Sequence, residues 1–249
     1  MSRPPPAPVP WEEVMDRLAR FYHAGDWRVP YLRDHAEDPF QVLVGTILSQ
    51  RTRDANTDRA CAALFARYPD ATSLADAPVA ELEGILRPVG FYRAKARNIR
   101  ACARAVRDAP GGVVPREMEA LLALPGVGRK TANCVLVFGF GLPGLPVDTH
   151  VHRIANRLGA VRTEDPEATE EALRRVVPVR LWNPMNPLLV QHGQNLCRPR
   201  HPLCPRCPLE TLCPTGRARA NGSPTPRPED RIPPARPAPG RRGGLRGKR

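Results

Sequence analysis

The chain of 249 residues is poor in aromatic residues, in residues that favour β-strands, and in lysine. Aromatic residues make up 5% of it, and the apolar residues recur at helical rather than alternating spacing, which argues against a sheet fold and predicts an all-α protein. No run approaches the roughly 18 apolar residues of a membrane span. The start, MSRPPPAPVP, also lacks the apolar core of a signal peptide. We therefore expect no membrane partner and a protein that stays in the compartment that made it.

Positive charge is abundant, but it is unevenly spread and almost entirely carried by arginine. Lysine occurs only as Lys95, Lys130 and Lys248, and the formal net charge is +13. Such a charge suggests an acidic polymer as partner, and DNA, RNA and a membrane surface all satisfy it. Residues 215–249 alone contribute +8 of the total. The basic character is therefore largely that of a tail.

Proline-rich ends flank a helical middle. Residues 1–10 and 215–249 have the composition of disordered segments. A first helix begins at Trp11 and ends near Gly25, and Asp38-Pro39 supplies an N-cap and a first-turn proline for a buried helix. Apolar spacing and short Gly or Pro connections predict further helices over residues 55–67, 78–86, 92–107, 116–123, 128–139, 149–158, 166–176 and 184–195.

Seven cysteines are an odd number for a disulfide framework, and four of them crowd together near the end of the folded part. They follow the order Cys197-x6-Cys204-x2-Cys207-x5-Cys213. Four thiolates in one short loop can hold zinc or a 4Fe–4S cluster, and the ligand type alone does not separate the two. The other three lie among apolar residues of predicted helices, where core packing is expected: Cys61, Cys102 and Cys134.

Residues 116–139 read as a helix-hairpin-helix, with a turn at Pro125-Gly126-Val127-Gly128 between two short helices. Its glycines let the backbone approach a phosphate, and the start of the second helix favours an anion. A bare GxG also fits an ordinary corner between two helices. The segment does not match a nucleotide-binding P-loop, because its lysine is wrongly spaced from the glycines. It does not match a dinucleotide-binding fingerprint either, because no strand precedes the turn.

Lys130 and Asp148 are the candidate chemical groups. An amine can attack a sugar C1′, displace the base and form a Schiff base once it is deprotonated, which an arginine cannot do. Desolvation and the helix start are expected to lower the pKa of Lys130. Asp148 opens the helix that follows a Gly/Pro loop, where an N-cap role and a catalytic role are compatible.

Taken together, LPGVGRKTAN, VDTH and the cysteine spacing resemble the endonuclease III family of helix-hairpin-helix DNA glycosylases, over residues 35–214. The resemblance implies two helical domains, residues 36–145 and residues 11–35 plus 146–214, with a DNA-binding cleft between them. It also implies a 4Fe–4S cluster on the four cysteines. The expected partner is double-stranded DNA with damaged bases or abasic sites, bound by a monomer at the nucleoid of a bacterial or archaeal cytoplasm.

The resemblance assigns Lys130 as the nucleophile and Asp148 as the carboxylate facing it across the cleft. Together they would remove a base, with oxidised pyrimidines as the expected class, and then nick the strand by β-elimination. The positions expected to contact DNA are Gln50, Arg51, Phe91, Gly126, Val127, Gly128, Arg129, Thr131, His150, Arg153, Arg198 and Arg200.

Some positions depart from the family pattern. Arg51 stands where the bacterial type usually has Gln, Phe91 replaces an aliphatic residue, and Trp182 with residues 183–187 is atypical. The preferred lesion therefore stays open. A monofunctional adenine or mismatch glycosylase is one alternative, against which Lys130 argues. A weakly active iron–sulfur DNA-binding relative is the other.

Overall fold

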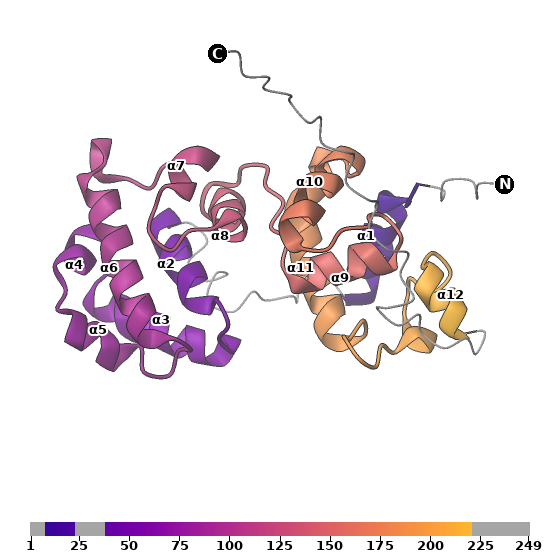
Figure 1. Cartoon of the computed structure of the whole chain (residues 1–249), viewed down its shortest axis with the longest axis horizontal. Coiled ribbons are helices and arrows are strands. Elements are labelled where there is room, and N and C mark those ends of the chain that lie inside the picture. Colours follow the sequence, from indigo (N-terminus) through magenta and orange to yellow (C-terminus); the bar gives the residue numbers. More distant parts are fainter. Residues whose placement is uncertain (1–7, 23–37, 221–249) are drawn as a thin grey trace, which may run out of the picture.

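A computed structural model describes residues 8–22 and 38–220, and every regular element in these two ranges is a helix (Figure 1). The prediction of an all-α protein is confirmed. The expected disordered ends lie mostly outside the described residues. Their boundary at 215 is wrong, because helix α12 (Pro214–Ala220) continues the folded part. Within the described ranges, no helix is both long enough and apolar enough to cross a bilayer.

The first group of helices, which we call the hairpin region, comprises residues 38–140 (Figure 1). Its elements are α2 (Pro39–Ser49), α3 (Asp54–Arg67), α4 (Ala71–Asp76), α5 (Val79–Ile85), α6 (Tyr92–Asp108), a 3₁₀ turn (Pro110–Gly112), α7 (Met118–Leu122), α8 (Arg129–Cys134) and a π-helical turn (Val135–Gly139). The buried helix predicted after Asp38 is α2, which contacts α3, α6, α8 and the π-helical turn. Its first turn is held by Asp38, whose Oδ1 accepts hydrogen bonds from Phe40 N (2.9 Å) and Gln41 N (3.3 Å).

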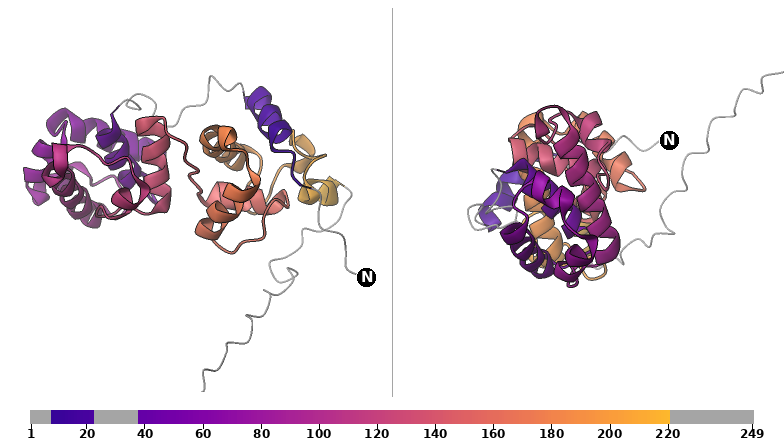
Figure 2. Two further views of the ribbon diagram at one scale, coloured as in Figure 1. Left: turned by 90° about the horizontal axis from the view of Figure 1, so that it is seen from above. Right: turned by 90° about the vertical axis from the view of Figure 1, so that its left-hand side faces the viewer.

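The second group, which we call the cysteine region, joins residues 8–22 to residues 145–220. Its elements are α1 (Trp11–Tyr22), α9 (Thr149–Arg157), α10 (Pro166–Val176), a 3₁₀ turn (Val179–Leu181), α11 (Trp182–Asn195), a second 3₁₀ turn (Cys204–Arg206) and α12. The first helix of the chain thus packs with its last helices, and α1 lies beside α11 (Figures 1 and 2). Trp11, Val14 and Leu18 carry α1 into this core at the spacing of one helical face.

Most of the predicted helices are present with ends shifted by one or two residues, and three differences have physical causes. Helix α4 was not predicted; Asp70 and Ser73 form a capping box that starts this short element. The predicted helix 128–139 changes to π-helical geometry after Cys134. Helix α11 begins at Trp182, two residues earlier than expected, and the Trp182 indole donates to Val177 O (3.0 Å) just before it.

Candidate active site and cysteine-lined cavity

The hairpin turn brings Lys130 to the edge of the hairpin region that faces the cysteine region. Gly126 adopts φ +80°, a left-handed conformation that favours glycine, and Gly128 caps the start of α8. Val127 N donates to Leu124 O (3.2 Å), which closes the turn. Lys130 is therefore the second residue of a helix whose preceding loop has a fixed shape.

Gln50, predicted as a DNA contact, holds the hairpin from the end of α2. Its Nε2 donates to Gly126 O (3.3 Å) and to Thr131 Oγ1 (3.2 Å), although the residue as a whole is exposed. Thr131 itself is buried and Val127 is half-buried. The structure thus brings Gln50, Gly126, Val127 and Thr131 together, and it gives the side chains of Gln50 and Thr131 a contact with each other.

Lys95 is a site residue that the sequence reasoning missed. It is 5% exposed, and its Nζ donates to Leu48 O (2.8 Å), Thr52 Oγ1 (2.9 Å) and Gln50 O. Burial lowers its pKa to about 8. The ammonium thereby holds the last carbonyls of α2 and the turn that follows. The available signal was composition, since Lys95 is one of three lysines in an arginine-rich chain.

Arg51 and Phe91 project from two loops that touch. Both have left-handed backbones, with φ of 51° and 58°, and Phe91 is 65% exposed. The Arg51 guanidinium carbon lies 5.9 Å from the centre of the Phe91 ring. A Cβ on Gly90 would lie 2.8 Å from Arg51 O, so only glycine permits this approach. These two predicted DNA contacts therefore form one exposed pair on strained backbone.

Asp148 is the N-cap of α9, as its position in the sequence indicated. Its Oδ1 accepts hydrogen bonds from His150 N (2.8 Å) and Val151 N (2.9 Å), which fix the carboxylate at the start of the helix. Its charge acts on Lys130 across the two regions. The carboxylate is therefore within electrostatic range of the amine, although the two groups come from different helices, α9 and α8.

The expectation of a lowered Lys130 pKa is wrong. Negative charge on Cys134 raises this pKa, burial lowers it, Asp148 raises it further, and the net direction is upward. Burial raises the pKa of the Cys134 thiol, and the positive charge of Lys130 lowers it. Cys134, expected in a core, is buried against the side chain of Lys130.

Three of the predicted DNA contacts have hydrogen-bond partners within the protein: Arg129, His150 and Arg153. The Arg153 guanidinium donates to Cys197 O (2.9 Å) and Gly193 O (3.1 Å) and lies 3.1 Å from His150 Nδ1. The Arg129 guanidinium binds the carboxylate of Glu170. Arg153 and Arg129 thus fasten the structure around the site, and that role was not visible in the sequence. Arg198 and Arg200 are exposed on the cysteine loop.

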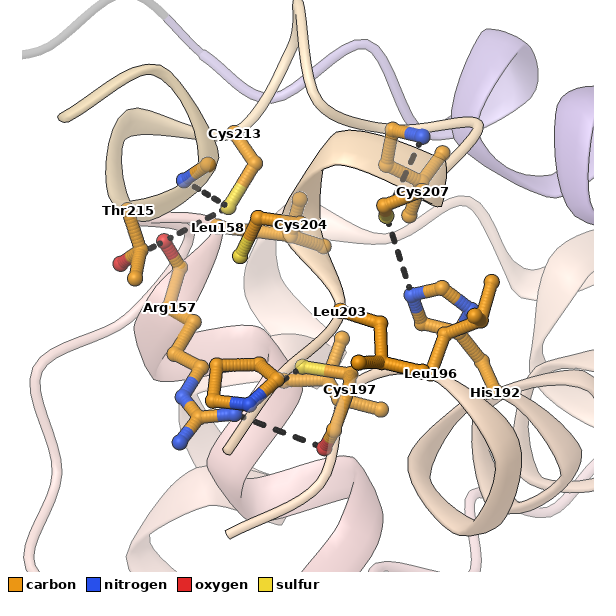
Figure 3. Close-up of a pocket in the computed structure, with 14 residues that line it drawn as sticks. Arg157, Leu158, His192, Leu196, Cys197, Leu203, Cys204, Cys207, Cys213 and Thr215 are labelled. Carbon is orange, nitrogen blue, oxygen red and sulfur yellow. Dashed lines mark hydrogen bonds between the residues drawn. The ribbon is translucent and has the colours of Figure 1, made fainter. Parts of the chain in front are cut away.

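The cysteines Cys197, Cys204, Cys207 and Cys213 line a single cavity (Figure 3). Arg157 donates to Cys197 Sγ (3.2 Å), Leu209 N to Cys207 Sγ (3.4 Å) and Gly216 N to Cys213 Sγ (3.4 Å). His192 Nε2 lies 3.4 Å from Cys207 Sγ. Donors directed at sulfur stabilise the thiolate form that binds metal. The residues therefore suit an anionic sulfur-ligated group.

Burial opposes ionisation of the same thiols, since it raises the pKa of Cys207 to about 12 and raises the pKa values of Cys204 and Cys213. A positive metal centre is what stabilises buried thiolates in proteins. Among the described residues, no three His, Cys, Asp or Glu side chains gather around one point as a single metal ion requires.

Comparison with known proteins gives consistent results. Residues 44–179 match the model of the HhH-GPD superfamily of base excision DNA repair proteins. Endonuclease III of Thermotoga maritima is 50% identical over 191 residues, which cover 76% of this chain and 90% of that protein.

Two solved structures share the fold at 34% identity and a TM-score of 0.76. One is a non-covalent complex of endonuclease III with DNA, matched over 85% of this chain and 97% of that one. The other is a trapped covalent intermediate of endonuclease III with DNA, matched over 84% and 97%. The match to each of these proteins extends over nearly its whole length.

Proposed function

The chain belongs to the HhH-GPD superfamily of base excision DNA repair proteins, and from this premise we propose that it is a DNA glycosylase and abasic-site lyase of the endonuclease III type. One observation carries the proposal: Lys130, second residue of the hairpin helix α8, interacts with Asp148 at the start of α9. An amine beside a carboxylate, next to a turn suited to phosphate, is the arrangement that Schiff-base chemistry on DNA requires.

The first reaction removes the base. The raised pKa of Lys130 means that the resting amine is an ammonium, so it must lose a proton before it attacks, and Asp148 is the nearby carboxylate that can accept this proton as a general base. Nζ then bonds to C1′ and the glycosidic bond breaks, with its electron pair leaving on the base, which takes up a proton. The Asp148 carboxylate stabilises the positive charge that develops on the sugar.

The second reaction cuts the strand. Opening of the sugar converts the adduct to a Schiff base, which makes the 2′ hydrogen acidic. Removal of that proton forms the C1′–C2′ enamine, whose electrons expel the 3′ phosphate as the C3′–O bond breaks. The products are a nicked strand and a free 5′ phosphate on the downstream piece, and water later releases Lys130.

We assign the DNA grip to the hairpin turn and the damage reading to the Arg51–Phe91 pair. Backbone N–H groups of a turn hold phosphate without reading sequence, which suits an enzyme that acts anywhere in a genome. A base must leave the stack before Lys130 can reach its sugar, and exposed side chains on fixed loops can fill the gap. Oxidised pyrimidines in duplex DNA are the proposed substrates.

We assign a 4Fe–4S cluster to Cys197, Cys204, Cys207 and Cys213. When bound, it supplies four metal–sulfur bonds that fix the loop. Arg157 extends from α9 to Arg198 O (2.8 Å) and Pro199 O (2.7 Å), so the same loop is tied to the helix that Asp148 starts. The role of the proposed cluster is therefore to place the cationic loop, with exposed Arg198 and Arg200, beside the active site.

The activity is tested with duplexes that contain thymine glycol, an abasic site or an adenine mismatch, with borohydride present to reduce any Schiff base. We expect a covalent protein–DNA adduct with the first two and none for Lys130→Ala. Lys248→Ala, which removes another of the three lysines, is the control and should still form the adduct. Base release without an adduct would indicate a monofunctional glycosylase, and binding without either would indicate a noncatalytic relative.

The metal is tested separately, by iron and zinc analysis and by absorption near 400 nm. We expect iron with visible absorption, and loss of both in Cys204→Ala. Stoichiometric zinc without iron would overturn the cluster assignment and leave the lyase assignment standing.

A further inference from the structure

Glu170 is a buried carboxylate between the two regions. It lies on α10, in the cysteine region, and is 2% exposed. Its carboxylate accepts a two-point contact from Arg129 of α8: NH2 to Oε1 at 2.8 Å and Nε to Oε2 at 3.2 Å. This paired geometry fixes the planes of both groups, which makes it stronger and more directional than a single contact. Arg129 immediately precedes Lys130 in the chain.

A second arginine extends the contact toward Asp148. Arg174 donates through Nε to Glu170 Oε1 (3.0 Å) and through NH2 to Asn133 Oδ1 (3.1 Å). Asn133, which is fully buried, accepts from Leu145 N (2.9 Å) through the same oxygen. Leu145 lies three residues before Asp148 in the segment that joins the two regions.

The hydrogen bonds close into a ring, because Asn133 Nδ2 also donates to Arg129 O (3.0 Å). The ring runs from Glu170 to Arg129, on to Asn133, then to Arg174 and back to Glu170. The joining segment is held again from α11, where Asn183 Oδ1 accepts from Gly144 N (3.1 Å). Arg174 also lies over the Trp182 ring, with 4.7 Å between its guanidinium carbon and the ring centre.

A buried ion network of this kind is poor evidence of a stability role, since well-packed apolar residues of similar volume are often at least as stabilising. What such a network does supply is a fixed geometry. Here the network connects Arg129, the neighbour of Lys130, to the segment that leads into Asp148. Lys130 and Asp148 otherwise lie in different regions of the molecule, on α8 and at the start of α9.

We propose that Glu170 is a positioning residue for the lyase reaction, which sets the separation of Lys130 and Asp148 by holding Arg129 directly and the Leu145 segment through Arg174 and Asn133. The inference rests on the proposed function. Glu170 does not touch DNA; it acts through the two residues that do the chemistry.

The test compares Glu170→Gln with Glu171→Gln, a matched control that removes the same charge from the exposed neighbouring position. Single-turnover nicking of an abasic duplex is measured with saturating enzyme, and affinity is measured with a duplex that carries a tetrahydrofuran abasic analogue. The fraction of molecules that borohydride can trap at long times counts correctly folded enzyme, so rates are expressed per trappable molecule.

We expect Glu170→Gln to slow nicking per trappable molecule by at least about tenfold, because small misplacements of reacting groups have effects of this size or larger. Affinity for the analogue should stay within about twofold, since no binding group is removed. Glu171→Gln should match the wild-type protein. Arg129→Met, which breaks the ring from the hairpin side, should reproduce the rate loss and serves if Glu170→Gln does not fold.

A wild-type rate per trappable molecule in Glu170→Gln or in Arg129→Met would overturn the inference, as would a loss explained entirely by weaker binding or a smaller trappable fraction. Failure of the wild-type protein itself to form any adduct is a different result, which would overturn the proposed function and this inference with it.

Discussion

The hairpin region and the cysteine region bury their helices by different means. The hairpin core is formed by apolar side chains from one continuous stretch, Phe40 to Leu136, in which α2 is the central helix. The core of the cysteine region is smaller and joins α1 from the start of the chain to α9, α10 and α11 from its end. Cys197, Cys207 and Cys213 pack against it from the cysteine loop.

This difference separates the roles of the two regions in the candidate site. The hairpin region contains Lys130, the proposed nucleophile, and is stabilised by ordinary hydrophobic burial. The cysteine region contains Asp148, and part of its packing depends on sulfur ligands whose buried thiols favour a bound metal centre. Loss of the metal should therefore disrupt the site from the side of Asp148 and leave the Lys130 side folded.

The largest expected effect follows from removal of the cluster. We expect Cys204→Ala to lose nicking activity by more than about a hundredfold and to melt in two steps, with the cysteine region unfolding first. In a Trp27→Phe background the two remaining tryptophans, Trp11 and Trp182, both lie in that region, so their fluorescence should report the first step and circular dichroism both steps. Cys102→Ala, in the hairpin core, is the control and should keep its iron. A single coincident transition in Cys204→Ala would contradict the division.

Two leucine-to-alanine changes, one in each core, test whether the two cores are independent. Leu64 and Leu189 are fully buried, one in each core, and either change to Ala should lower the free energy of unfolding by about 2–5 kcal/mol in the iron-loaded protein. After iron removal, Leu64→Ala should keep its effect, whereas Leu189→Ala should lose most of its own because the packing around Leu189 is already loosened. Denaturant titration with and without iron measures both, and equal effects in the iron-free protein would argue against two independent cores.

The pH dependence of stability should also differ between the regions. The Lys95 pKa falls from 10.5 to about 8 on folding, so between these values the unfolded chain binds the proton more strongly. Stability therefore rises with pH across this window, by roughly 1–3 kcal/mol, and the penalty is fully present below pH 8. Melting of the hairpin region at pH 7.5 and 10, compared with Lys95→Met, isolates the effect. The variant should show a smaller rise, and an identical rise would contradict the assignment to Lys95.

The smallest expected effect comes from helix caps. Asp38 caps α2, and Asp165 caps α10 by accepting from Ala168 N (2.8 Å). Each change to Ala should lower stability by about 1 kcal/mol. Asp38→Ala should shift only the transition of the hairpin region, and Asp165→Ala only that of the cysteine region. Each change is made in the Cys204→Ala protein, whose melting is followed by fluorescence and circular dichroism. A shift of both transitions by either change would show that the regions unfold together.

Much of the fold could be predicted because its signals are local. Asp38-Pro39, the Gly126 turn and the apolar face of α1 each depend on neighbours within a few residues. The same holds for the cysteine loop, whose spacing lies within one short segment. The irregular π-helical turn after Cys134 lacks such a signal, and it was predicted as ordinary helix.

The site could be predicted only in part, because its geometry joins distant segments. The sequence singled out Lys130 and Asp148 by their chemistry, but the direction of the Lys130 pKa depends on Cys134 and Asp148 together, and that balance was predicted wrongly. Glu170 has an acidic neighbour and lies on a charged helix, so the sequence alone predicts an exposed surface position. Only the approach of α8 to α10 shows that it is buried.

The placement of α1 has a consequence for the newly made chain. Among the helices of the described residues, α1 is made first, yet its partner α11 is synthesised more than a hundred residues later. The hairpin region can fold as soon as its own residues are made, as units of this kind generally do. Throughout that interval Trp11, Val14 and Leu18 have no core to enter. Among the candidate site residues the four cysteines are made last, so the region that contains the Lys130 amine can fold before the proposed cluster ligands are present.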